Sequence, residues 1–197
     1  MRPVPKMVLC AGACALALGA SVLAASQRRP IDTVHSRLTI HVGKEGLFSA
    51  LGHDHEISAP VARGEVATTA PEFVEFTVET AKMIVQDPQE SESSRADVQK
   101  AMLGAQVLDI AKYPEIHFVS ESVERKDDTH WRVHGKLALH GTTKQILVET
   151  RLENGHYRGK VSLKQTDYGI TPIRVAGGTV NVKDELEIDF DIMLAGQ

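Results

Sequence analysis

The fold predicted from the sequence depends most on residues 112–148, which read KYPEIHFVSESVERKDDTHWRVHGKLALHGTTKQILV. Tyr113-Pro114 ends the helical segment before it, because proline lacks an amide donor and disfavours helical geometry in the preceding residue. Beyond it, apolar and polar residues alternate in three runs, separated by turn signals at 126–129 and 141–143. Three successive antiparallel strands form a meander, so this stretch predicts a curved sheet with one apolar face.

The alternation also predicts which side chains share that apolar face. Successive residues of a strand point to opposite sides, so every second residue lies on the same face. The apolar face is expected to hold Ile116, Phe118, Trp131, Val133, Leu137 and Leu139. Charged residues and histidines occupy the opposite parity, so what the apolar face encloses becomes the functional question.

The N-terminus has the three parts of a secretory signal peptide. Arg2 and Lys6 precede an apolar run over 7–20, and small residues lead to Ala24 and Ala25. The run is shorter than the roughly 20 residues of a membrane-spanning helix. We therefore expect a signal peptide over the first 25 residues, cleavage near Ala24 or Ala25, and a periplasmic or secreted protein.

The remaining residues, 26–197, are expected to form one domain whose fold starts after residue 30. Both cysteines, Cys10 and Cys14, lie inside the apolar run, so the exported chain must be stabilised by its core without disulfides. Loss of the two basic residues of the signal peptide changes the formal net charge from −4 to about −6. A mildly acidic chain without a basic block argues against nucleic acid as a partner.

Upstream of the meander, alternation predicts three more strands. The first runs from Val34 to Val42, with a turn at 43–46. Two others are predicted at 63–69 and 72–80, joined by a hairpin at Ala70-Pro71. Pro60 is expected at a sheet edge or a strand start, because proline cannot donate to a ladder.

A short helix is predicted between the second hairpin strand and the meander. Serine is favoured at helix N-caps, so Ser94 is the predicted N-cap, with Asp97 three residues later in capping-box spacing. Gly104 is predicted to end the helix. Val98, Ala101 and Met102 share one face of this helix. The insertion is longer than a connection requires, so we expect it to cap or cover a site.

A pair of histidines raises the possibility of a metal site. His53 and His55 are two residues apart and would project from the same face of an extended chain, a spacing that suits zinc or copper. Further ligands would have to come from Asp54, Glu56, His35 or His41. The alternative is that the segment makes local hydrogen bonds at the entrance of a strand.

Strand patterns at 148–152, 157–163 and 186–194 complete the chain, and the last has one wholly apolar face. The count is about eight strands with one helical insertion. That is the size at which an antiparallel sheet closes into a barrel around one small ligand. A two-sheet sandwich would show the same alternation, and the helical insertion favours the barrel.

Short sequence motifs at five places in the chain stand in a specific order and at specific spacings. They are VHS at 34–36, LD at 108–109 followed by KYPEIHF at 112–118, GKLALHGTT at 135–143, DYGI at 167–170, and VKDEL at 182–186. In these pieces the chain resembles the YceI family of exported, lipocalin-like lipid-binding proteins. The resemblance implies a barrel whose apolar interior encloses a polyisoprenoid or fatty acyl chain as ligand, with no other cofactor. The segment 46–57 departs from the glycine-and-phenylalanine loop that members often carry.

Strand parity gives the expected lipid-contacting residues. The wall is predicted to consist of Phe76, Val78, Ile116, Phe118, Leu137, Leu139, Ile188, Phe190 and Ile192, with Phe48, Leu51 and Met102 near the mouth. Tyr168 and Trp131 are expected as polar-tipped contacts or as plugs at a barrel end. Each of these residues would equally serve ordinary core packing.

Catalysis is not expected. The sequence has no Gly-x-Ser-x-Gly or His-Glu-x-x-His motif, and the exported part has no thiol. A metal-dependent protein using His53 and His55, and a ligand-free scaffold or stress protein, remain the alternatives to a lipid carrier. Transient membrane contact and a homodimer stay open as further partners, as does the choice between transport and storage of the lipid.

Overall fold

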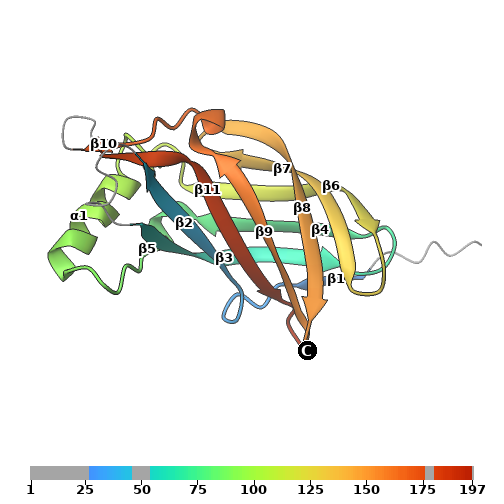
Figure 1. Cartoon of the computed structure of the whole chain (residues 1–197). Coiled ribbons are helices and arrows are strands. Elements are labelled where there is room, and N and C mark those ends of the chain that lie inside the picture. Colours follow the sequence, from blue (N-terminus) through green and yellow to red (C-terminus); the bar gives the residue numbers. More distant parts are fainter. Residues whose placement is uncertain (1–26, 46–53, 176–179, 197) are drawn as a thin grey trace, which may run out of the picture.

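The computed structural model describes residues 27–45, 54–175 and 180–196, and its strands form one antiparallel barrel (Figure 1). The strands that form the ring, in pairing order, are β3 (His55–Ala67), β2 (Arg37–Glu45), β11 (Val180–Met193), β9 (His156–Lys164), β8 (Thr142–Glu153), β7 (His130–Leu139), β6 (Glu115–Arg125) and β4 (Phe73–Glu79). Pairing of β4 with β3 closes the ring. The prediction of an all-β antiparallel barrel of about eight strands with a helical insertion is confirmed.

Three short strands and three helical segments complete the described chain. β1 (Arg28–Pro30) and β5 (Ile84–Val85) pair with β3, and β10 (Arg174–Val175) pairs with β11. The helical segments are η2 (Thr80–Lys82), α1 (Glu92–Leu103) and η3 (Gln165–Tyr168). Within the described ranges, no helix is long and apolar enough to cross a membrane.

The predicted meander is present as β6, β7 and β8, which pair in sequence order. The pairing of β6 with β7 shifts register between Ser120 and Ser122, which is the mark of a bulge. Ile116 and Phe118 face the interior before the shift, and Val123 faces it afterwards. The bulge therefore reverses the parity that alternation alone would assign to the end of this strand.

β3 is longer than predicted because it changes partners along its length. Its first half pairs with β2 up to Pro60, and its second half pairs with β4 from Val61 onward. Pro60 thus lies inside a strand, at the point where the partner changes, which corrects its expected place at an edge or strand start. The strand expected to begin at residue 63 begins at His55.

The N-terminal strand prediction needs two corrections. Residues 28–30 already form β1, before the expected start of the fold after residue 30, while Val34 lies in a turn with 84% of its surface exposed. Asp32 forms that turn by accepting hydrogen bonds from the Val34 and His35 amides, at 3.0 Å and 3.1 Å. Gly43 lies within β2 and not in a turn.

Helix α1 lies at one end of the barrel and contacts β5 (Figure 1). Its N-cap is Ser91, whose side chain accepts from the Ser94 amide at 3.1 Å, so the predicted cap at Ser94 is wrong by one turn. Gly104 is the C-cap, as predicted. The predicted inner face of the helix, Val98, Ala101 and Met102, lines the interior of the barrel.

The barrel wall is incomplete between β8 and β9. These strands pair only from Arg151 to Glu153, next to their connecting turn. η3 contacts both strands, and its Tyr168 packs in a core cluster with Phe118, Val133, Leu137 and Leu163. Tyr168 therefore fills the wall where backbone pairing ends.

Candidate functional site: an apolar cavity inside the barrel

The interior of the barrel holds a cavity of about 590 Å³. Its lining consists mainly of aliphatic and aromatic side chains from the inward parity of the barrel strands, together with the inner face of α1. A volume of this size lies in the range of roughly 300–1,000 Å³ found for small-molecule sites. The cavity is therefore large enough for a ligand and offers it an almost wholly apolar surface.

Most of the residues predicted to form the lipid-contacting wall line this cavity. They are Phe76, Val78, Met102, Ile116, Phe118, Leu137, Leu139, Ile188, Phe190 and Ile192, together with Trp131. Tyr168 is buried in the wall between β8 and β9 and is not among the lining residues. Phe48 and Leu51 lie outside the described residues. Contact of any of these side chains with a lipid stays a prediction.

Several lining residues were not predicted. They include Ile57 and Ala59 of β3, Ile146 and Val148 of β8, and Val161 and Leu163 of β9. The signal that could have found them is the same alternation, since His55, Ile57 and Ala59 fall on one parity. The strand of Ile57 and Ala59 was predicted to begin only at residue 63, and the strands of the other four residues were left out of the predicted wall.

Two glycines give the aromatic rings of the lining their positions. A Cβ atom at Gly135 would lie 2.5 Å from Phe118 Cζ, and one at Gly159 would lie 2.5 Å from Phe190 Cζ. Each ring therefore lies directly over the bare backbone of a neighbouring strand. Phe118 also packs against Phe76, with ring centroids 5.4 Å apart. The glycines allow the rings to lie against the wall, which leaves the centre of the barrel open.

At the end covered by α1, His55 contributes a polar group to the lining. Its Nδ1 lies 2.6 Å from Asp87 Oδ2, and the other carboxylate oxygen of Asp87 accepts a hydrogen bond from the Glu56 amide at 2.8 Å. The Asp87 side chain is only 2% exposed. A hydrogen bond made at the strand entrance was the alternative to a metal site in the sequence, but Asp87 is a partner that spacing could not have indicated.

The predicted metal ligands are not gathered in the described part of the chain. His53 lies outside the described residues, and His55 points into the barrel while His41 is on the outer face. His35 is held by Asp32 in the turn before β2. A metal site at His53 and His55 therefore stays an untested prediction.

On the outer face, His41, Glu187 and Asp189 bring ligand atoms within 4.8 Å of one another. Lys160 already occupies this cluster, with its ammonium 2.7 Å from Glu187 and 3.1 Å from Asp189. Desolvation acts to raise the pKa of Asp189, but hydrogen bonds from Lys160 and His41 outweigh it and hold the pKa below its usual value. The cluster is a surface ion-pair network in which lysine supplies the positive charge.

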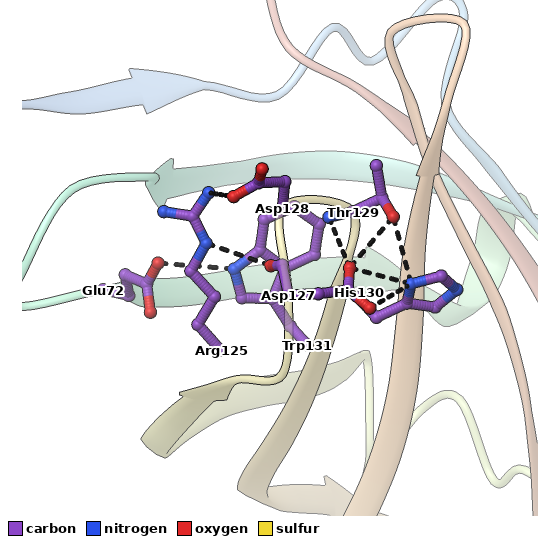
Figure 2. Close-up of polar contacts among 7 residues, drawn as sticks. All are labelled: Glu72, Arg125, Asp127, Asp128, Thr129, His130 and Trp131. Atoms are coloured by element: carbon purple, nitrogen blue, oxygen red, sulfur yellow. Dashed lines mark hydrogen bonds and ion pairs between the residues drawn. The ribbon is translucent and has the colours of Figure 1, made fainter.

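At the opposite end, Trp131 closes the lining beside the β6–β7 turn. Figure 2 shows its indole Nε1 directed at the Glu72 carboxylate, 3.3 Å away. The Tyr157 ring lies 5.7 Å from the Trp131 ring between centroids, and burial raises the pKa of its phenol. The cavity therefore ends here in two aromatic side chains.

The turn that carries Trp131 is held by Asp127. Its carboxylate accepts hydrogen bonds from the Thr129 amide at 2.7 Å and from His130 Nδ1 at 3.0 Å (Figure 2). These contacts, that of the Thr129 amide first, lower the pKa of Asp127 to about 2. The carboxylate thus fixes the turn from which Trp131 enters the barrel.

The titratable side chains that line the cavity lie towards its two ends. Lys44, His55 and Asp97 belong to the α1 end, and Glu72 and Tyr157 to the other. Among the described lining residues there is no serine or cysteine to act as a nucleophile. Chemically, the arrangement is suited to holding an elongated apolar molecule with one polar end.

Comparison with known proteins identifies similar chains over nearly the whole domain. The sequence profile of the YceI-like domain matches residues 30–194. The "UPF0312 protein" of Pseudomonas syringae pv. syringae is 28% identical over 197 residues, covering 90% of this chain and 94% of that protein. The "UPF0312 protein" of Azotobacter vinelandii is 27% identical over 176 residues, covering 79% of this chain and 85% of that protein.

Two solved structures share the fold. BcnA of Burkholderia cenocepacia superposes with a TM-score of 0.59 at 19% identity, over 82% of this chain and 98% of that chain. A polyisoprenoid binding domain from Saccharophagus degradans, implicated in plant cell wall breakdown, superposes with a TM-score of 0.56 at 15% identity, over 83% of this chain and 95% of that chain. At these identities the likeness establishes the fold.

Proposed function

The chain belongs to the family of YceI-like domains, and from this premise we propose that it is a lipid-binding protein that holds a polyisoprenoid or fatty acyl chain inside its barrel. The observation that carries the proposal is the apolar cavity of about 590 Å³. The structural likeness to a polyisoprenoid binding domain is consistent with this ligand class. Binding without catalysis, and without a cofactor other than the lipid, is part of the proposal.

The energetics favour a long hydrocarbon over a compact polar ligand. Burial of hydrocarbon contributes on the order of 0.8 kcal/mol per methylene group, so an apolar lining can bind a long chain with few polar contacts. The inward residues run from Met102 of α1 to Trp131 at the far end. A chain extended between these ends would bury its whole length.

We also propose that the protein is exported and carries or stores its lipid in the periplasm or outside the cell. This part rests on the N-terminal sequence, with Arg2 and Lys6 before an apolar run and small residues at Ala24 and Ala25. Mass analysis of the protein recovered from the periplasmic fraction or the medium would give the cleavage site directly.

The test is native mass spectrometry of the recovered protein, followed by solvent extraction and mass analysis of whatever is released. We expect one isoprenoid or acyl species per chain. A mass without ligand that persists after incubation with polyprenyl and fatty acyl lipids would overturn the proposal. Metal bound in stoichiometric amount instead would favour the site at His53 and His55.

A pair of variants ties the ligand to the cavity. Ala59 is buried and lines the cavity, so the larger side chain of Ala59→Phe should fill part of the ligand volume and reduce lipid occupancy at least severalfold. Leu147 is exposed on β8 and absent from the lining, so Leu147→Phe is the matched control and should keep full occupancy. Equal occupancy in both variants would place the lipid elsewhere.

A further inference from the structure

The polar end of the cavity contains a histidine whose ring is fixed by a buried carboxylate. His55 Nδ1 is 2.6 Å from Asp87 Oδ2, and Asp87 is itself held by the Glu56 amide. The same loop is anchored by the Gln86 amide, which donates to the Glu56 carbonyl at 2.8 Å. His55 therefore has a fixed orientation within the lining of the cavity.

The chemistry of this pair specifies what the other ring nitrogen can do. A carboxylate only accepts hydrogen bonds, so Nδ1 carries a proton and donates to Asp87, and in the neutral form of the ring Nε2 then keeps a lone pair. Among the described residues, no hydrogen bond or ion pair involves Nε2. With a neutral His55, the lining thus offers a hydrogen-bond acceptor at the end of an otherwise apolar cavity.

The surrounding charge disfavours an anionic partner for this nitrogen. Asp87 lies directly behind the ring, and Asp97 of α1 lines the same end. Of the nearby cations, Lys44 is 3.7 Å from the Asp54 carboxylate. Arg95, which does not line the cavity, donates to the Asp87 carbonyl at 3.5 Å. A phosphate or carboxylate head group would therefore face more negative than positive charge, whereas a neutral hydroxyl would not.

We propose that His55, positioned by Asp87, recognises the hydroxyl head group of a long-chain alcohol, an isoprenol or a fatty alcohol, by accepting its hydrogen bond at Nε2. The inference rests on the proposed lipid-binding function and names the class of head group that the same site selects. The apolar chain of the ligand extends from His55 along the barrel towards Trp131.

The test measures affinity for three probes of equal chain length: farnesol, farnesyl methyl ether and farnesyl phosphate. Trp131 is the single tryptophan of the chain and lines the cavity, so its emission reports ligand entry in the delipidated full-length protein. Farnesol should bind roughly 2- to 12-fold more tightly than the ether, the range expected for one net neutral hydrogen bond, because the ether cannot donate. Farnesyl phosphate should bind more weakly than farnesol.

Two variants separate recognition by His55 from general effects on the cavity. In Asp87→Asn the amide donates to Nδ1, so Nε2 carries the proton and donates to an alcohol or an ether oxygen alike. The ratio of the two affinities should then fall to about one. His55→Phe should abolish the discrimination as well. Circular dichroism of each variant checks that the fold is kept, and the isosteric Asp87→Asn change keeps the acceptor for the Glu56 amide.

A matched control exists on the outside of the barrel. His156 Nδ1 is also 2.6 Å from a carboxylate, that of Asp191, but His156 does not line the cavity. His156→Phe should therefore leave the alcohol-to-ether ratio unchanged.

The outcomes distinguish this inference from the proposed function. Equal affinities for farnesol and its ether in the wild-type protein, or discrimination that survives in both His55→Phe and Asp87→Asn, would overturn the inference while lipid binding stands. Tighter binding of farnesyl phosphate than of farnesol would replace the neutral head group by an anionic one. If none of the three probes changes the Trp131 emission or appears as a bound species by native mass spectrometry, the proposed function itself fails.

Discussion

Tyr168 is 2% exposed, yet its hydroxyl has no hydrogen-bond partner among the described residues. The sequence allowed either a polar-tipped ligand contact or a plug at a barrel end. In the structure the ring packs in the wall, where η3 contacts β8 and β9, and does not line the cavity. The ring fills space that backbone pairing leaves open, while burial of the hydroxyl opposes folding. The two parts of this side chain therefore have opposite effects on stability.

Tyr168→Phe tests this balance. The variant keeps the ring and removes an unpaired buried hydroxyl, so we expect the free energy of unfolding at pH 8 to stay unchanged or rise by about 1 kcal/mol. Denaturant unfolding measures it. A loss of more than about 1 kcal/mol would mean that the hydroxyl is hydrogen-bonded in the folded protein.

The same variant has a signature in alkaline solution. Burial raises the pKa of Tyr168 above its usual value of 10.0, so the folded protein retains this proton at a pH where the unfolded chain has lost it. The contribution of this raised pKa to the free energy of unfolding is fully present below about pH 10. It is lost as the pH rises through the pKa of Tyr168 in the folded protein. Tyr168→Phe should lose less stability than the wild type between pH 9 and the folded pKa, with a remaining slope from Tyr157.

At the scale of single elements, close packing of the barrel strands requires glycine at particular positions as much as it requires large side chains at others. Gly159 pairs directly with Phe190 on β11, and the Phe190 ring lies over it. Glycine weakens an isolated strand through its conformational entropy, yet here it allows close approach of a ring and of another backbone. The backbone of β8 comes even closer than the ring, because a Cβ atom added at Gly159 would lie 2.2 Å from the Glu149 carbonyl oxygen.

Gly159→Ala should therefore destabilise the fold by about 1–3 kcal/mol, because the backbone of β8 and the Phe190 ring must both move. Gly43 of β2 is the control, since an added Cβ would meet Lys183 Cδ at 2.9 Å, in the middle of a flexible exposed side chain. Gly43→Ala should change the free energy of unfolding by less than about 0.5 kcal/mol. Equal effects of the two substitutions in denaturant unfolding would contradict the close packing at Gly159.

For the whole molecule, an open interior means that folding and ligand binding are linked. The cavity occupies the place where side chains would otherwise pack, so a filled barrel regains the dispersion contacts that an empty one lacks. Core residues such as Phe118 and Ile192 contribute to both the core clusters and the cavity lining. Bound lipid is thus expected to act as part of the core.

The ligand that extraction identifies should raise the stability of the delipidated protein by about 2.7 kcal/mol when its free concentration is 100 times the dissociation constant. Thermal unfolding measures this as an increase in Tm with ligand concentration. Ala59→Phe should show a much smaller increase at the same concentration, because its cavity is partly filled. A Tm that does not respond to ligand in either protein would show that binding does not involve the folded interior.

Much of the architecture could be predicted from the amino-acid sequence alone. The meander of β6 to β8, the apolar faces of its strands, the short helix before the meander and the family resemblance are all confirmed. The meander and its apolar faces follow from a local pattern, because side-chain direction in a strand has a period of two. Corrections arose where the chain departs from that pattern, at the bulge after Ser120 in the pairing of β6 with β7 and at the local turn that Asp32 caps.

Only the tertiary structure decided how the sheet closes and which polar groups meet. The pairing of β3 with β4 separates a barrel from a sandwich, and alternation is identical in both. Asp87 lies 32 residues from His55, in a loop without any periodic signal, so no spacing could have joined them. Except beyond the bulge in β6, the sequence by itself determined which strand side chains face inward, since that depends on neighbours along the chain, and the long-range pairings determined what they enclose.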